Sequence, residues 1–308
     1  MIGIVDIGVS YGDVVIDNLR RAQTFDRPED FIRDKIGFTE LRRKQPETET
    51  SDLCVAAFEN LCERTPIDPE SVECIVVVTQ TPDGHGLPHT SSIVQGKLGL
   101  HGAAAFDVSL GCSGYVHGLS ILNAFMQANG MRCGLLFTAD PYSKVLDSED
   151  VVTELLFGDG ATCTLIGTDP LYQLGHCLFE NDGTKHQLLS VEKTGRLQMD
   201  GRSIFNFSLG TVPRQIKKCL EQNQLTPADV DLFVLHQASR YIVENMAKRL
   251  GVPAEKVPFA LARIGNTVSS TIPMTLQPRL QEKQRTILIS GFGVGLSWGT
   301  TVLKRCSA

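Results

Sequence analysis

The sequence repeats one arrangement of short apolar runs and helical segments in its two halves. The first half contains, in order, a strand at Cys74–Thr79, a strand at Ala104–Val108, a helix at Tyr115–Asn129 and strands at Gly134–Thr138 and Thr162–Ile166. The second half contains a strand at Leu232–Leu235, a short apolar segment at Val257–Leu261, a helix-like run at Ser270–Leu280 and strands at Thr286–Ser290 and Leu296–Leu303. Such repetition is typical of a fold built from two copies of one supersecondary unit.

Apolar Val- and Ile-rich runs that alternate with helical segments predict an α/β fold with a mostly parallel sheet. Each half places a turn directly before its central helix. Cys112 lies in this turn six residues after Phe106, and Asn266 lies in the corresponding turn seven residues after Phe259. We therefore predict two halves, residues 1–169 and 170–308, with the cysteine and the asparagine at equivalent positions. Two unrelated α/β halves of similar pattern are the alternative.

Composition narrows the possible functions. The 308 residues are 42% hydrophobic, which suffices for a large core, and the net charge of −6 disfavours nucleic acid as a partner. The nine cysteines include no CxxC pair and no Cys/His cluster of zinc spacing, so we expect no metal site and a reduced, cytoplasmic setting. Met1–Val15 lacks the basic start of a signal peptide and is interpreted as a first strand. No apolar stretch approaches the roughly 20 residues of a membrane span.

Cys112 is the strongest candidate for a chemical role. It lies in the run Ala105–Tyr115, between an apolar strand and a helix. Unpaired backbone N–H groups and the positive dipole end of a helix N-terminus favour a thiolate over a thiol. The neighbours Gly111, Ser113 and Gly114 leave room for a substrate carbonyl. A buried structural cysteine is the alternative, since free cysteine is among the most buried residue types.

Two further polar residues follow the same placement. His236 lies in the run Phe233–Ser239, at the point where a strand ends and a helix begins. Open α/β sheets place their sites at such strand ends. Asn266 lies in the turn described above. Taken singly, the histidine suits a core position and the asparagine an ordinary turn. Together with Cys112 they suit thioester chemistry, in which a thiolate takes up an acyl group and the two other side chains polarise a second thioester carbonyl.

Other chemistries were weighed for these residues. A Cys/His/Asn set also suits a thiol protease, but the duplicated plan and the Gly-rich C-terminal strand disfavour that interpretation. The Gly-rich segments Phe157–Ala161 and Gly291–Gly295 match neither a dinucleotide-binding nor a Walker pattern, and both lead into strands. We therefore expect them to serve close packing at a strand start, with the backbone N–H groups of Cys112 and of the second loop forming an oxyanion hole.

The chain resembles the ketoacyl-ACP synthase III family over nearly its whole length. The motifs of this resemblance occur in the family's order and are Phe106–Gly114, Phe157–Ala161, His236–Ser239, Gly265–Thr267 and Gly291–Gly299. The resemblance implies the thiolase fold, in which duplicated βαβαβαββ halves pack as a five-layer αβαβα sandwich. It also implies a homodimeric acyltransferase of fatty acid biosynthesis without a resident cofactor, which uses an acyl-CoA primer and malonyl-ACP or malonyl-CoA as extender.

The resemblance assigns roles to individual residues. Cys112 is implied as the nucleophile, His236 and Asn266 as the groups that polarise the malonyl thioester, and the amide of Val294 as the second half of the oxyanion hole. Three further residues are implied to bind coenzyme A: Phe31 stacks on the adenine, and Lys35 and Arg240 meet phosphates. Leu87 corresponds to a residue that reaches into the partner subunit's acyl pocket.

The chain also departs from the family's pattern. Val151 stands where an arginine is usual, Ser239 where an asparagine is usual, and Tyr241 where a basic residue is usual, while Val294 replaces a glycine. The first three changes predict altered docking of coenzyme A and carrier protein, and the last predicts altered space beside the acyl group; together they predict a specialised pathway. Two alternative functions remain at this point. One is an acyltransferase that moves the acyl group to an alcohol or amine without forming a C–C bond, and the other is a subunit of a heterodimeric synthase.

Overall fold

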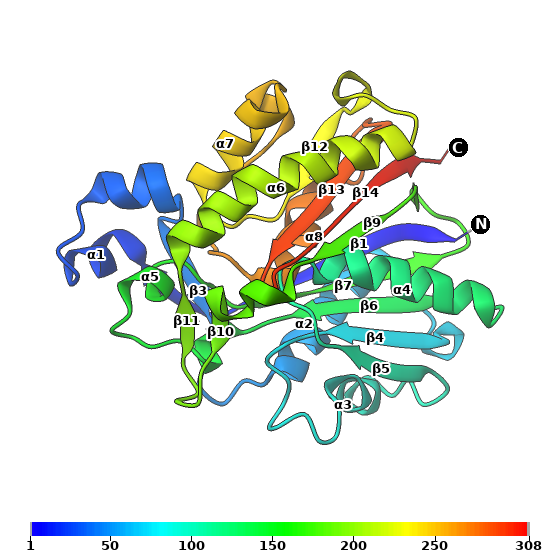
Figure 1. The fold of residues 1–308 in the computed structure, drawn as a ribbon. Coiled ribbons are helices and arrows are strands. Elements are labelled where there is room, and N and C mark those ends of the chain that lie inside the picture. Colours follow the sequence, from blue (N-terminus) through cyan, green and yellow to red (C-terminus); the bar gives the residue numbers. More distant parts are fainter. Residues whose placement is uncertain (1, 307–308) are drawn as a thin grey trace.

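The computed structural model describes residues 2–306, whose main sheet has the strand order β12-β13-β14-β8-β1-β7-β6-β4-β5, with β9 paired to β14 (Figure 1). The strands of this sheet are β1 (Gly3–Tyr11), β4 (Cys74–Val78), β5 (Ala104–Val108), β6 (Gly134–Ala139), β7 (Gly160–Gly167), β8 (Tyr172–Leu174), β9 (Leu178–Asn181), β12 (Leu232–Leu235), β13 (Thr286–Gly293) and β14 (Ser297–Arg305). β4 pairs in parallel with β5 and β6, and β12 pairs in parallel with β13. The other pairings are antiparallel, so the sheet is mixed.

Helices cover the strands in the layers expected for two stacked halves. These helices are α2 (Thr50–Arg64), α3 (Thr90–Lys97), α4 (Gly114–Ala128), α6 (Gly201–Gln222), α7 (Arg240–Leu250) and α8 (Thr271–Leu276). α4 contacts β4 and β6 on one side and β13 and β14 on the other, and α8 contacts both β7 and β12. α2 and α3 pack on the first group of strands, while α6 packs on β13, β14 and α7 (Figure 1). α4 and α8 therefore form a central layer between two sheet layers.

Smaller elements lie at the end of the molecule that carries the turns before α4 and α8. They are β2 (Val14–Asp17), α1 (Asn18–Gln23), a π-helix at Phe31–Ile36, β3 (Glu40–Arg43), α5 (Val151–Glu154), β10 (Leu189–Val191) and β11 (Leu197–Met199). α7 packs on the π-helix, and α5 packs on β11. These contacts bring segments from distant parts of the chain together at one place. No helix among the described residues 2–306 is long and apolar enough to cross a membrane.

Small residues let α4 approach the sheet closely. A Cβ atom at Gly114 would lie 2.4 Å from Cγ1 of Val78, and one at Gly118 would lie 2.8 Å from Cδ1 of Leu136. Any larger side chain at either position would push the helix away from β4 and β6. Because Cys112 immediately precedes this helix, the same packing fixes the position of the cysteine relative to the sheet.

The sequence predicted the repeated plan, and the structure corrects two of its details. The strand at Leu232–Leu235 is confirmed, and the central helices α4 and α8 follow Cys112 and Asn266 respectively. Val257–Leu261 forms no strand, although Ala104–Val108 does. The Gly-rich segment does not open the last strand: β13 continues to Gly293, where it pairs with Ser297, so the segment forms the end of one strand and a tight hairpin.

Candidate active site

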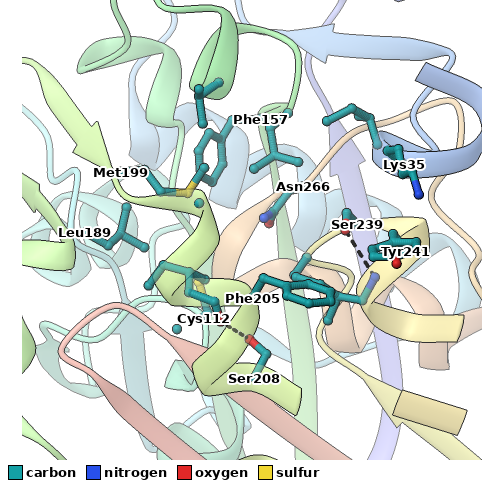
Figure 2. A pocket seen from close by; sticks show the side chains of 18 of the residues that line it. Lys35, Cys112, Phe157, Leu189, Met199, Phe205, Ser208, Ser239, Tyr241 and Asn266 are labelled. Atoms are coloured by element: carbon teal, nitrogen blue, oxygen red, sulfur yellow. Dashed lines mark hydrogen bonds between the residues drawn. The ribbon is translucent and has the colours of Figure 1, made fainter. Parts of the chain in front are cut away.

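A largely apolar cavity of about 370 Å³ lies where the strands β12 and β13 and the helices α4 and α6 end or begin. Cys112, His236 and Asn266 all line it. In Figure 2, Cys112 and Asn266 face the same space, with Leu189 and Met199 on one side and Lys35 and Tyr241 on the other. The fold thus brings together the three residues that the sequence singled out, from segments up to 154 positions apart in the chain.

Cys112 lies two residues before α4 and is 3% exposed. Burial raises the pKa of the Cys112 thiol to about 12, although hydrogen bonds from the backbone N–H groups of Val294 and of Cys112 itself lower it. Desolvation of the thiolate therefore outweighs the N–H groups at the helix start, which were expected to favour the thiolate. The same two amides point at the sulfur, as an oxyanion hole beside this nucleophile requires.

Glycines give the sulfur its space. A Cβ atom at Gly293 would lie 2.7 Å from Sγ of Cys112, and one at Gly291 would lie 2.6 Å from the carbonyl oxygen of Cys112. The end of β13 therefore packs directly against the cysteine. On the other side of the cysteine loop, Cγ1 of Val294 lies 2.5 Å from the position of a Cβ atom on Gly111. The glycines expected to serve close packing do so, and Gly291 and Gly293 pack against Cys112.

His236 directly follows β12 and is 2% exposed. Its Nδ1 lies 2.7 Å from Oγ1 of Thr271, whose hydroxyl also donates to the carbonyl oxygen of Val268 at 3.1 Å. This arrangement places the proton of the neutral ring on Nδ1 and leaves Nε2 with a free lone pair. Burial lowers the pKa of His236 to about 3, so the ring is neutral at physiological pH. A neutral ring can take a proton from a neighbouring thiol.

Asn266 is fixed by both its backbone and its side chain. Its N–H donates to the carbonyl oxygen of Leu156 at 3.0 Å, and its carbonyl oxygen accepts from the N–H of Gly158 at 3.1 Å. Its Oδ1 accepts from the N–H of Val268 at 2.9 Å. Because the oxygen is the atom that accepts from this amide, Nδ2 is the atom left as a donor for a ligand in the cavity. The side chain is therefore oriented as a hydrogen-bond donor, as polarisation of a carbonyl requires.

Comparison with known proteins agrees with this geometry. Sequence profiles for 3-oxoacyl-[acyl-carrier-protein (ACP)] synthase III match residues 106–183, and those for its C-terminal part match residues 220–305. The chain is 34% identical over 309 residues to beta-ketoacyl-[acyl-carrier-protein] synthase III of Streptococcus sanguinis, covering 94% of each chain. It is 33% identical over 327 residues to a second such synthase from Deinococcus radiodurans, covering 98% of this chain and 94% of the other. The chain belongs to the beta-ketoacyl-[acyl-carrier-protein] synthase III family.

The solved structures of this family confirm the thiolase fold. The crystal structure of the synthase III from Thermus thermophilus superimposes with a TM-score of 0.92 at 31% identity, covering 99% of this chain and 100% of that one. The synthase III from Aquifex aeolicus has a TM-score of 0.92 at 28% identity, again with 99% and 100% covered. The observed layers, with α4 and α8 at the centre, agree with the thiolase fold that the resemblance implied.

The mouth of the cavity carries the departures from the synthase III pattern. Nζ of Lys35 lies 4.0 Å from the centre of the Tyr241 ring, and this ring stacks on Phe205 at 5.4 Å with an interplanar angle of 18°. All three residues line the cavity, as do Phe31 and Val151. Phe205 and Tyr241 therefore form an aromatic stack at the cavity, with the Lys35 ammonium group over the Tyr241 ring.

Two residues assigned from the resemblance lie outside the cavity. The Arg240 guanidinium stacks on Phe259 at 4.8 Å and lines a neighbouring surface pocket that shares Lys35 and Tyr241 with the mouth. Leu87 is 92% exposed, in the loop between β4 and α3. Leu87 therefore forms no part of this chain's own cavity.

Most residues in the largely apolar wall of the cavity were not predicted from the sequence. These residues are Leu156, Leu189, Met199, Ile204, Phe205 and Ser208. Most of them belong to β10, β11 and the start of α6, to which no role was assigned from the sequence. The apolar face of α6 was the available signal: Ile204 and Ser208, one turn apart, both face the cavity. No cluster of side chains suited to a metal ion occurs within residues 2–306.

Proposed function

We propose that this chain is a decarboxylative condensing enzyme, which loads an acyl group from acyl-CoA onto Cys112 and joins it to a malonyl thioester with loss of CO₂. The observation that carries the proposal is one cavity that Cys112, His236 and Asn266 line together, with the amides of Cys112 and Val294 directed at the sulfur. Membership of the synthase III family supports the same reaction class.

In the loading step, Nε2 of His236 accepts the proton of the Cys112 thiol as the sulfur attacks the acyl-CoA carbonyl. The tetrahedral oxyanion accepts hydrogen bonds from the amides of Cys112 and Val294. The C–S bond to coenzyme A then breaks, and His236 returns the proton to the leaving thiolate. The products are a neutral acyl-Cys112 thioester and free coenzyme A. Because the pKa of the Cys112 thiol is raised to about 12 and that of His236 is lowered to about 3, the proton moves to Nε2 only as the sulfur–carbon bond forms, and no free thiolate precedes the attack.

In the condensing step, the malonyl C–C bond breaks, CO₂ leaves and the electron pair moves into the thioester to form an enolate. Nδ2 of Asn266 donates to the enolate oxygen. His236 donates as well when its ring loses the Nδ1 proton to solvent and takes one up at Nε2; the hydroxyl of Thr271 then turns from the carbonyl oxygen of Val268 to donate to Nδ1. The enolate carbon attacks the acyl-Cys112 carbonyl, the C–S bond breaks, and the thiolate takes a proton from solvent.

The substrates are thioesters of coenzyme A and of an acyl carrier protein, and the reaction needs no resident cofactor. Phe31 and Lys35 line the mouth, where an aromatic ring and an ammonium group suit the adenine and phosphates of coenzyme A. Arg240, in the adjoining pocket, suits a more distant phosphate. The functional unit is a homodimer in which Leu87 of each subunit enters the acyl pocket of the other, and its setting is the cytoplasm.

The test is a condensation assay with acyl-CoA and malonyl-ACP, which measures the 3-oxoacyl thioester and CO₂. We expect both products with the wild type and no 3-oxoacyl thioester with Cys112→Ala in the presence of primer. Asn266→Ala should still acquire the acyl group but should lose CO₂ release. If Asn266→Ala instead transfers the acyl group to an alcohol or amine at the wild-type rate, the function is acyl transfer without C–C bond formation. If the pure chain never becomes acylated, it is a subunit of a heterodimeric synthase.

A further inference from the structure

Asp140 is a fully buried carboxylate beside the active site to which the proposed reaction gives no role. It immediately follows β6 and is 0% exposed. Its Oδ1 accepts from the N–H of Gln80 at 2.6 Å, and its Oδ2 accepts from both the N–H and the hydroxyl of Ser269. Among residues 2–306, no lysine, arginine or histidine forms an ion pair with it. The carboxylate therefore depends on neutral donors alone.

The three segments joined by Asp140 come from both halves of the fold. Gln80 follows β4, whose carboxyl end lies beside that of β6 in the parallel pair. Ser269 belongs to the short 3-10 helix Val268–Ser270 that leads into α8. A second hydrogen bond joins the same two segments: Oγ of Ser270 donates to the carbonyl oxygen of Thr138 at 2.9 Å. The end of β6 thus holds the segment before α8 against the first half of the molecule.

The segment held in this way supports both polar groups of the condensing step. The N–H of Val268 fixes Oδ1 of Asn266, and Thr271 contacts Nδ1 of His236. Val268 has a φ angle of 55°, in the left-handed region that β-branched residues rarely adopt. A residue in that region persists only where its surroundings hold it. Ser269, the next residue, is the one that Asp140 binds.

Asp140 also borders the cysteine loop. The side chain of Gln80, whose backbone Asp140 binds, accepts a hydrogen bond from the Tyr142 hydroxyl at 3.0 Å and packs against Gly111, which precedes Cys112. Burial is the main cause of the raised pKa values of Cys112, Tyr142 and Cys54, and negative charge on Asp140 raises each of them further. Removal of this charge should therefore make the cysteine more acidic.

We propose that Asp140 is a positioning residue for the condensing step, which locks the segment carrying Asn266 and supporting His236 onto the loops that flank Cys112. This inference rests on the proposed function, because the positioned groups matter through malonyl decarboxylation. Asp140 touches neither substrate nor reacting atoms, and it acts through Ser269 and Gln80.

The test compares Asp140→Asn with the wild type in two separate assays. The amide keeps the size of the side chain but replaces one accepting oxygen with a donor, so one of its two partners is lost. We expect kcat for malonyl decarboxylation to fall about 10- to 100-fold with KM nearly unchanged, as for a misplacement of up to about 1 Å in a catalytic group. Alkylation of Cys112 by iodoacetamide at pH 8 should rise about 3- to 10-fold, because a negative charge near the thiol is gone.

Two further variants separate positioning from general destabilisation. Asp6→Asn alters another buried carboxylate, which is 4% exposed on β1 and binds Arg64 and Thr65; it should leave both rates within about twofold of the wild type. Ser269→Ala removes only a hydroxyl donor, so it should slow decarboxylation without raising alkylation. It also keeps the test decisive if Asp140→Asn fails to fold.

The outcomes distinguish a failure of the proposed function from a failure of the positioning role of Asp140. A wild type that neither acquires an acyl group nor releases CO₂ overturns the proposed function, and the role of Asp140 in it. An active wild type with unchanged decarboxylation in Asp140→Asn, or in Ser269→Ala where the former is unfolded, overturns the positioning role alone. Equal losses of decarboxylation and alkylation in Asp140→Asn also overturn it, because they indicate a merely structural residue.

Discussion

The contact between Gly293 and Cys112 allows a perturbation of the nucleophile that leaves its chemistry intact. In Gly293→Ala, the new Cβ would lie 2.7 Å from Sγ and 2.9 Å from Cβ of Cys112. Ordinary contact begins at 3.4 Å, so the thiol or the end of β13 must move by about 0.7 Å. Such movement takes the sulfur away from the amides of Val294 and Cys112 that lie beside it.

From this displacement we expect acylation of Cys112 to slow about 10- to 100-fold, since misplacement of a reacting group by about 1 Å can reduce a rate about 100-fold. Overpacking should also cost about 1–3 kcal/mol in the free energy of unfolding. The assays are the rate of acyl-enzyme formation by intact-protein mass spectrometry and the denaturant midpoint.

The matched control is Gly210→Ala, on an exposed turn of α6 where no atom lies within 4 Å of the new Cβ. It should leave acylation unchanged and stabilise the protein by about 0.5–1 kcal/mol, because alanine favours the helix. An acylation rate of Gly293→Ala within twofold of the wild type would refute the inference that the end of β13 positions the sulfur.

Three further predictions follow from the site. Iodoacetamide alkylation of the wild-type Cys112 should rise about tenfold per pH unit from pH 7 to 9 with no plateau, because burial raises the thiol pKa to about 12 and only the thiolate reacts; a plateau below pH 8 would contradict this. Lys35→Met should raise KM for acyl-CoA about tenfold with kcat nearly unchanged, whereas Lys283→Met, an exposed lysine outside the cavity, should not. Leu87→Asp should weaken a homodimer that the wild type shows in sedimentation, and an unchanged association constant would argue against the interface role.

Local patterns predicted much of the fold because its strands are short, apolar and repeated. The strand at Leu232–Leu235 is buried throughout, and its continuous run of apolar residues indicates this in the sequence. Val257–Leu261 carries a similar apolar pattern but forms no strand, and its buried side chains pack in the core without backbone pairing. The extension of β13 to Gly293 was also missed, because glycines in a strand weaken the local signal and their purpose here is contact with a distant cysteine.

The candidate site likewise has one part that the sequence indicates and another that depends on the folded structure. Cys112, His236 and Asn266 each stand at a strand or helix end, where sequence context marks a residue as exceptional. The raised pKa of Cys112 was not predictable, because it depends on how deeply the fold buries the thiol. Asp140 gives no signal of its own in the sequence, since its importance comes from Ser269, 129 positions later in the chain. A contact between residues so far apart in the chain forms only when the two halves have packed together.

The central claim is that Cys112 carries the acyl group, and one measurement tests it most directly. The wild type and Cys112→Ala are incubated with acyl-CoA thioesters from acetyl to dodecanoyl, and the intact masses are recorded. The account predicts one acyl adduct on the wild type and none on Cys112→Ala. An adduct of equal yield on both proteins would place the acyl group elsewhere and contradict the account.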